Sequence, residues 1–517
     1  MNKVAKTTIM LMIVTMITKI LGFLREIVLT STYGTSNISD AYITAISIPG
    51  VIFVAIGTAI ATTFIPLFIE VENKEGNKRA IQFADSVFNI VIIISILIAI
   101  LGFIFAKPLV KVFAMNFEGE TLIIASEFTK IMMVGIVFIG MSDIIKAWLQ
   151  INGNFKVPGM ISLPYNIIII ISIIISAKTN VYMLPIGVLM AMMSQFLFQL
   201  PHACKLGYRY RLKINFKDEY VKKMLILIIP VFLGIAVNQV NTIVDRSLAS
   251  TLGEGIITSL NSANKLNGFV IAMFISTLAA VIYPTLSQLS NSNDNTMFID
   301  TICKSINSVI ILIIPISIGA IVLSTPIVKL VFERGAFTSN ATIITSTALA
   351  LYSIGMVGTG LMDILGKVFY SLKDTKTPMK NGALSMGINI VLNIILIQFL
   401  GYAGLPLATS IASIISVLLM FRSLKNKMGY FGQDKIIKTM IKVFISSGIM
   451  AILTKISYNY LSLTLAQNSI GEIITLIGSV IVGIISYFTM ISLLKIEEIN
   501  ILLTFIKNKI LKLKRVK

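Results

Sequence analysis

The stretch Lys19-Ile-Leu-Gly-Phe-Leu-Arg25-Glu26 decides the fold, because it places three charged residues inside a long apolar segment. Between Thr7 and Tyr33 the segment holds no other charged residue, and it is longer than the roughly 20 residues that cross a membrane. A charge at mid-membrane costs about 3 kcal/mol even on lenient scales, so such residues usually face a cavity and mark a transport path. The stretch therefore predicts a membrane-spanning helix in a protein that moves a polar, anionic compound.

The composition extends this prediction to the whole chain. Of its 517 residues, 56% are hydrophobic and 13% charged, and the mean hydropathy is +0.91. A soluble protein carries about 25% charged residues. Fourteen apolar runs, joined by short loops, predict an all-α polytopic membrane protein with fourteen transmembrane helices. Because no loop is long enough to form a catalytic domain, we expect no enzymatic activity.

The net charge of +20 invites a nucleic-acid interpretation, but the distribution of the basic residues argues against it. Most Lys and Arg residues fall in alternate loops, on one predicted side of the membrane. This is the positive-inside pattern, which places both termini in the cytoplasm. The basic charge therefore predicts the topology, and we expect no nucleic-acid partner.

The sequence also contains an internal repeat, because several pairs of residues recur in the same order about 220 positions apart. The pairs are Arg25 and Arg246, Pro108-Leu-Val-Lys111 and Pro326-Ile-Val-Lys329, Asp143 and Asp363, and Leu184-Pro185 and Leu405-Pro406. They predict two parallel-repeat lobes of six helices each, residues 1–211 and 212–427, which rock around a central site. A C-terminal helix pair, residues 428–494, lies outside the duplication. We expect the chain to act as a monomer.

Residues 495–517 form a basic tail in which apolar residues alternate with Lys and Arg. This pattern is typical of an amphipathic helix that lies on the anionic lipids of the inner leaflet. An ordinary frayed basic tail explains the pattern equally well.

Charged residues on two predicted helices are the candidate substrate site. On the first helix Lys19 and Glu26 are seven residues apart and share a face, while Arg25 is offset by about 100°. Lys265 lies on the eighth helix, among several Asn residues. A cationic, partly dry cleft suits a phosphate or pyrophosphate, which Arg grips with two parallel hydrogen bonds. The alternative is that these charges only pair with one another between helices.

A second group of residues carries oxygen ligands. Asp245 lies deep in the seventh helix, Asn389 and Asn393 share a face of the eleventh, and Thr409 follows on the twelfth. One carboxylate with amide and hydroxyl oxygens is a ligand set for a hard cation, and its single negative charge suits Na⁺. The alternative is that the Asn and Thr side chains only join membrane helices together.

The chain resembles the MurJ (MviN) family of lipid II flippases, in the superfamily that also holds multidrug and polysaccharide exporters. The similarity runs through nearly the whole chain. It is carried by the opening stretch and by Ser39-Asp40-Ala41-Tyr42, Val244-Asp245-Arg246, Leu260-Asn-Ser-Ala-Asn-Lys265-Leu, Phe332-Glu-Arg334-Gly335-Ala336-Phe337 and Phe369-Tyr370-Ser-Leu-Lys-Asp374-Thr-Lys-Thr-Pro378.

The resemblance implies a protein of the bacterial cytoplasmic membrane that exports lipid II, the undecaprenyl-pyrophosphate-linked disaccharide pentapeptide used for peptidoglycan. It implies that the final helix pair forms a groove for the lipid tail. Arg25 falls on the family's essential arginine, Glu26 on its acidic neighbour and Lys265 on its eighth-helix arginine, and we include Lys19 and Asp40 in the expected substrate site. Asp245, Asn389, Asn393, the Leu405 carbonyl and Thr409 fall on a sodium site described for the family.

The sequence departs from the family's pattern in three places. Phe53–Thr58 replaces a basic segment of the second helix, Lys19 and Lys265 stand where Arg is usual, and Asn393 stands where a carboxylate occurs. A flippase for another polyprenyl-linked oligosaccharide therefore remains an alternative. A multidrug or cation antiporter of the same superfamily is a second alternative, although it would favour an acidic cavity. A membrane-embedded glycan polymerase or transferase is a third, although it would need a larger outer loop.

Overall fold

The computed structural model describes residues 3–291, 295–465 and 468–496. Every regular element in these ranges is a helix. In the described part of the chain, ten helical segments are long and apolar enough to cross a membrane. The longest of them, Lys376–Met428, contains two 25-residue helices. The all-helical membrane fold expected from the sequence is therefore confirmed. Most of the tail predicted at 495–517 lies outside the described residues.

The chain divides into two compact units, and each is described here by itself. The first unit contains the chain up to Thr258 together with Arg334–Ala341. Its helices are α1 (Lys3–Tyr33), α2 (Asn37–Glu75), α3 (Asn77–Ile104), α4 (Ala106–Phe113), α5 (Gly119–Ile151), α6 (Lys156–Met160), α7 (Ser162–Ser176), α8 (Met183–Lys205), α9 (Glu219–Ala249) and the short η1 (Ser250–Leu252).

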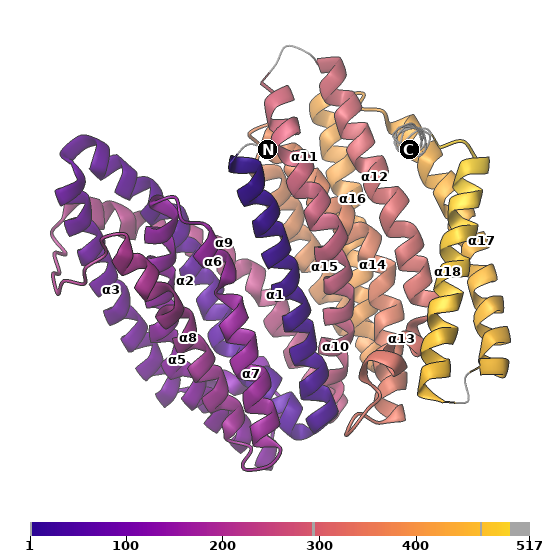
Figure 1. The fold of residues 1–517 in the computed structure, drawn as a ribbon, viewed down its shortest axis with the longest axis horizontal. Helices are drawn as coiled ribbons and strands as arrows, with labels where there is room; N and C mark the ends of the chain where they lie inside the picture. Colours follow the sequence, from indigo (N-terminus) through magenta and orange to yellow (C-terminus); the bar gives the residue numbers. More distant parts are fainter. Residues whose placement is uncertain (1–2, 292–294, 466–467, 497–517) are drawn as a thin grey trace, which may run out of the picture. The chain divides into compact units, whose positions relative to one another are not determined.

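The second unit contains Ser259–Glu333 and the chain from Thr342 onward. Helix α10 (Ile256–Val270) starts in the first unit and continues into the second, as does α14 (Ser339–Ser371). The other helices of the second unit are η2 (Ile271–Ile275), α11 (Ser276–Leu289), α12 (Asn295–Val322), α13 (Ser324–Phe332), α15 (Lys376–Leu400), η3 (Gly401–Ala403), α16 (Gly404–Met428), α17 (Gln433–Leu465) and α18 (Ser469–Leu493). Helices α17 and α18 lie side by side (Figure 1).

Helix α9 is tied to the helices before it, so the first compact unit extends to Thr258, into the stretch 212–427 predicted as the second lobe. Asp218 caps α9 by accepting hydrogen bonds from the amides of Tyr220 and Val221, and its other oxygen pairs with Arg79 at 2.6 Å. Lys223 pairs with Glu70 of α2 at 2.8 Å. The start of the predicted second lobe is thus anchored in the first unit.

The short helices α4 and α13 contain the repeated Pro-x-Val-Lys anchors, Pro108 to Lys111 and Pro326 to Lys329. The topology expected from the sequence places these residues in loops on the outer side of the membrane. Both prolines fall in the first helical turn, where a missing N–H costs nothing. The two copies of the repeat therefore fold into matching helices at this position.

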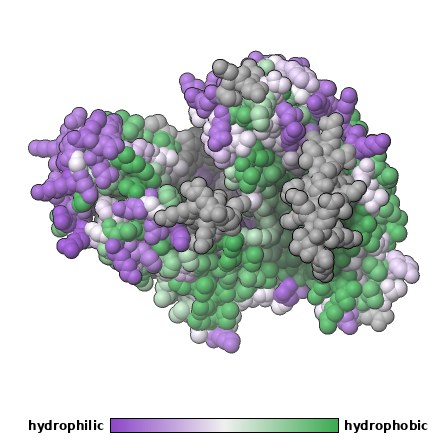
Figure 2. All heavy atoms as spheres, turned by 45° about the horizontal axis from the view of Figure 1, so that its top comes forward, coloured by the Kyte–Doolittle hydropathy of each residue, from purple (hydrophilic) through white to green (hydrophobic). Residues whose placement is uncertain are grey.

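Each unit has a hydrophobic core of its own. In the first unit Trp148 packs edge-on against Phe68 at 5.7 Å and against Tyr208 at 5.6 Å. In the second unit α12 contributes a buried stripe, Ile302, Ile306, Val309 and Ile313, with the spacing of one helix face. In Figure 2 hydrophobic residues cover broad areas of the visible surface, as expected for helices that contact lipid.

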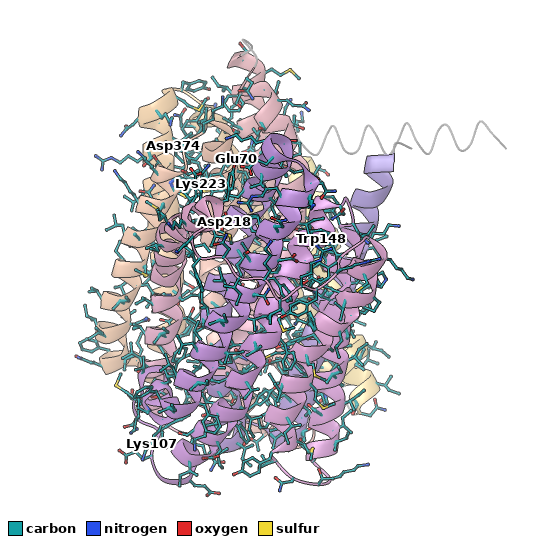
Figure 3. All side chains as sticks on the ribbon, turned by 90° about the vertical axis from the view of Figure 1, so that its left-hand side faces the viewer. Glu70, Lys107, Trp148, Asp218, Lys223 and Asp374 are labelled. Carbon is teal, nitrogen blue, oxygen red and sulfur yellow. The ribbon has the colours of Figure 1, made fainter. Side chains whose placement is uncertain are left out.

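Charged residues gather at the two ends of the first unit. Figure 3 places Glu70, Lys223 and Asp218 close together at one end and Lys107 at the other. The sequence predicts that Lys223 is cytoplasmic and that Lys107 is on the outer side. Their positions at opposite ends fit helices that cross from one side of the membrane to the other.

Candidate functional site

The charged residues of α1 lie in three different environments. Glu26 is buried, with 4% of its surface exposed, whereas Lys19 is exposed and Arg25 is half-buried. The guanidinium carbon of Arg25 lies 5.8 Å from the centre of the Tyr165 ring on α7. Since α1 packs along α7, this contact with the Tyr165 ring helps to hold the arginine in place. An arginine held by its face keeps the N–H groups on its edge for hydrogen bonding to an anion.

Tyr165 is a site residue that the sequence analysis missed. It lies in Ser162-Leu-Pro-Tyr165-Asn at the start of α7, and nothing in this segment indicates a contact with α1. Cation–π pairing of this kind contributes about 0.5–2 kcal/mol. The only signal in the sequence for this contact is that an aromatic residue lies near the break between α6 and α7.

Asp40, an expected substrate-binding residue, is used to hold the start of α10. It is 2% exposed. One carboxylate oxygen accepts hydrogen bonds from the Thr258 amide at 2.8 Å and the Thr258 hydroxyl at 2.6 Å, and the other accepts from the Gly255 amide at 2.7 Å. Carboxylates at a helix N-terminus are stabilising because the unpaired amides and the helix dipole favour negative charge. These contacts favour an anchoring role for Asp40 over direct substrate binding.

The Arg334-Gly335-Ala336-Phe337 motif docks on the end of α1. The Ala336 amide donates to the Ser31 carbonyl at 2.9 Å. Gly335 of the motif has a φ of +60°, and a side chain on it would collide with the Ser31 carbonyl. The motif therefore needs glycine and backbone contact, so its residues serve to join the second half of the sequence to α1.

Lys265 lies on α10, six residues before the start of the π-helix Ile271–Ile275, and is exposed. A π-helical turn inside a membrane helix often occurs at a functional site. Lys265 belongs to the second unit and Arg25 to the first.

Four of the five expected ion ligands come together in the second unit, on α15 and α16. The Asn393 amide donates to the Asn389 side-chain oxygen at 3.0 Å. The Asn389 amide donates to the Thr409 hydroxyl at 3.3 Å, and that hydroxyl donates to the Leu405 carbonyl at 3.0 Å. Asn389 and Asn393 are buried. All the groups are hard oxygen donors, which fits a monovalent cation such as Na⁺.

The fifth expected ligand, Asp245, belongs to α9 in the first unit. The Asn241 amide donates to its carboxylate at 3.3 Å. Among the described residues no group of three or more His, Cys, Asp and Glu side chains could hold a metal ion. The donor set expected from the sequence has one carboxylate, which suits a weakly held monovalent ion better than a divalent metal.

Solved structures identify the class of protein. An inward-facing multidrug resistance MATE transporter of the MOP superfamily is 13% identical, with a TM-score of 0.68 over 80% of this chain and 96% of that chain. At this identity the match shows the fold alone, which is the fold of the MOP transporters. A structure of lipid II flippase MurJ in an inward closed conformation is 29% identical, with a TM-score of 0.81 over 94% of this chain and 98% of that chain.

The chain belongs to the MurJ family, because the family's model, described as lipid II flippase MurJ, matches residues 29–494. A probable lipid II flippase MurJ from Buchnera aphidicola subsp. Baizongia pistaciae is 30% identical, over 88% of this chain and 90% of the relative. The lipid II flippase MurJ of Burkholderia cenocepacia is 26% identical, over 80% and 82%. The family expected from the sequence motifs is confirmed. Membership of this family favours a lipid flippase over the antiporter and polymerase alternatives.

Proposed function

We propose that this chain flips lipid II from the cytoplasmic to the outer leaflet of the bacterial cytoplasmic membrane by alternating access. The observation that carries the proposal is the family match over residues 29–494. The buried and half-buried charges of α1 support it, since intramembrane charges mark a transport path. The chain crosses the membrane fourteen times, with both termini in the cytoplasm, and acts as a monomer.

Arg25 and Lys265 bind the pyrophosphate of the substrate. The guanidinium of Arg25 supplies parallel N–H donors, and its stacking on Tyr165 fixes their orientation. Lys265 binds as a point charge. Buried Glu26 offsets the charge of the neighbouring arginine when the substrate is absent, and Lys19 attracts the anion toward the cleft.

Three contacts at one end of the first unit join the two predicted repeats. Asp40 holds Thr258, the Ser31 carbonyl holds Ala336, and the Asn37 amide donates to Glu254 at 2.9 Å. Each contact joins a residue of the first predicted repeat, 1–211, to a residue of the second, 212–427. Alternating access requires such contacts to break when the outer side opens. A substrate or ion must therefore bind the outward state more tightly for opening to occur.

Na⁺ is the proposed coupling ion, held by Asp245, Asn389, Asn393, the Leu405 carbonyl and Thr409. It supplies a charge whose binding and release shift the balance between the two states. The test is thermal unfolding of the purified protein in NaCl and in KCl. We expect Na⁺-specific stabilisation in the wild type and none in Asp245→Asn. Stabilisation that survives this substitution would remove Asp245 from the site, and stabilisation by neither salt would remove the ion.

The function is tested by depleting the protein in its host and measuring how much lipid II is accessible at the outer leaflet. We expect accessible lipid II to fall, and to be restored by the wild type but not by Arg25→Ala at equal membrane levels. If lipid II exposure is unchanged and another polyprenyl-linked glycan accumulates inside, the flippase mechanism stands and the proposed substrate is wrong.

A further inference from the structure

A cavity of about 300 Å³ in the second unit gathers lysines from three elements. We call it the lysine pocket. It is bounded by α12, the start of α17 and the residues that follow α18. The charged residues that line it are Asp300, Lys304, Lys435, Lys438, Lys442 and Lys495. Asp300 and Lys304 pair with each other at 2.6 Å, and in the described part of the chain the other four lysines form no ion pair. The pocket is therefore strongly cationic.

The positions of the lysines on α17 are unfavourable for the helix itself. Helix α17 begins at Gln433, and Lys435, Lys438 and Lys442 follow on one face. Like charges three and four residues apart destabilise a helix, and cations near its N-terminus oppose the helix dipole. Asp434 lies in the same first turn and offsets part of the charge of Lys438, while its carboxylate also accepts a hydrogen bond from Tyr430 at 2.6 Å. A bound anion would relieve this repulsion.

The positive-inside pattern alone does not account for the pocket. That pattern requires basic residues in cytoplasmic segments but sets no geometry among them. Here the side chains converge from α12, α17 and the end of α18. The Lys442 ammonium also donates to the Lys495 carbonyl at 3.4 Å, which joins two of the three elements. Lys495 has a φ of +50°, a left-handed conformation that costs a non-glycine residue about 1–2 kcal/mol.

The surface next to the pocket indicates which kind of anion it takes. Ile445 continues the face of Lys442 along α17 and is 51% exposed, and Phe488 lies in the last two turns of α18 and is 52% exposed. In a membrane helix such exposed apolar residues contact lipid chains. A cationic pocket next to an apolar, lipid-facing surface fits a lipid that has an anionic headgroup and acyl chains.

We propose that the lysine pocket binds the phosphate of an anionic phospholipid of the inner leaflet, with its chains along Ile445 and Phe488. This site is separate from the residues assigned to lipid II and lies outside the proposed transport step. The lysines hold the phosphate by charge, and the pocket orders the lipid against α12, α17 and the end of α18. The pocket thus serves as an anchor for the C-terminal helix pair on that leaflet.

The experiment measures lipid retention by the intact protein. The purified chain is mixed with phosphatidylglycerol, or with phosphatidylcholine as the neutral probe, and bound lipid is counted by native mass spectrometry. The test variant is Lys435→Gln/Lys438→Gln/Lys442→Gln. Its control is Lys205→Gln/Lys217→Gln/Lys222→Gln, which removes the same charge from exposed lysines of the first unit. The single variant Lys438→Gln is measured as well, so that the site is still tested if the triple variant does not fold.

We expect phosphatidylglycerol affinity to fall on the order of tenfold or more in the test variant, by a smaller factor in Lys438→Gln, and little in the control. Inorganic phosphate at millimolar concentration should not displace the lipid. Equal losses in the test and control variants would show non-specific attraction and overturn the site. Displacement by inorganic phosphate, or equal binding of phosphatidylcholine, would overturn the lipid as its ligand.

Discussion

Arg25 and Arg246 occupy equivalent positions in the two copies of the repeat, yet the structure places them in different environments. The guanidinium carbon of Arg25 lies 5.8 Å from the centre of the Tyr165 ring. Arg246 of α9 donates from its Nη1 to the Ile43 carbonyl of α2 at 2.6 Å. Ile43 is buried. One arginine contacts an aromatic ring, and the other donates a hydrogen bond to the backbone.

This difference shows why a duplicated residue need not have a duplicated role. The N–H edge of a guanidinium recognises phosphate, and stacking does not use that edge. In Arg246 part of the edge is committed to a carbonyl, so its contribution is to hold α9 against α2. We therefore expect substitutions at Arg25 to affect transport and substitutions at Arg246 to affect stability.

The largest expected effect is the loss of lipid II export in Arg25→Ala. Removing a charged hydrogen-bond donor from the substrate costs about 1.5–3 kcal/mol, or roughly ten- to a hundredfold in binding. In a depleted strain that carries Arg25→Ala, the lipid II accessible at the outer leaflet should fall by this factor. In a strain that carries Arg246→Ala at the same membrane level, accessible lipid II should stay within about threefold of wild type, because Arg246 is not assigned to the substrate. Equal loss in both variants would erase the distinction between the two arginines.

The next effect concerns the stability of Arg246→Ala. The buried Ile43 carbonyl loses a charged donor, so the free energy of unfolding should fall by about 1.5–3 kcal/mol. Thermal unfolding in detergent measures this, and Arg246→Lys is the matched control because it keeps a donor. An unchanged unfolding temperature in Arg246→Ala would contradict the scaffolding role.

Arg25→Lys sharpens the comparison, because it keeps the charge and removes the planar fork. Losing one of two parallel hydrogen bonds to phosphate costs about 1.4 kcal/mol, or about tenfold. Dose-dependent rescue of the depleted strain should show an intermediate phenotype. Wild-type rescue would mean that charge alone is sufficient at Arg25.

The smallest expected effect is that of Tyr165→Leu. It removes a cation–π contact worth about 0.5–2 kcal/mol, so lipid II export should fall only a few-fold. Tyr165→Phe keeps the ring and should behave as wild type. If Tyr165→Phe is impaired as strongly as Tyr165→Leu, the hydroxyl is the important group and the stacking argument fails.

Much of the fold followed from the sequence. The apolar runs predicted the helices, and the motifs around Arg25, Arg334 and Asp374 indicated the family that residues 29–494 match. The spacing of Asn389 and Asn393 predicted a shared face, and the structure joins them by a hydrogen bond. Such features depend on local periodicity and on residue type, which a single sequence contains.

The roles of individual side chains did not follow as directly. Asp40 stood in a motif with no sign that its carboxylate would accept hydrogen bonds from Gly255 and Thr258. Tyr165 and the unit boundary at Thr258 likewise depend on contacts between distant segments. A side chain's role depends on its neighbours in space, and one sequence records only neighbours along the chain.

The sequence by itself determined that the chain is helical, lies in a membrane and carries charge on its first helix, because transfer free energies and helical periodicity depend on residue type alone. Only the tertiary structure decided which repeated arginine stacks on an aromatic ring and which bonds to a backbone carbonyl. It also gathered lysines from α12, α17 and the end of α18 into one pocket. The physical reason is that both results require residues far apart in the chain to pack within a few ångströms of one another.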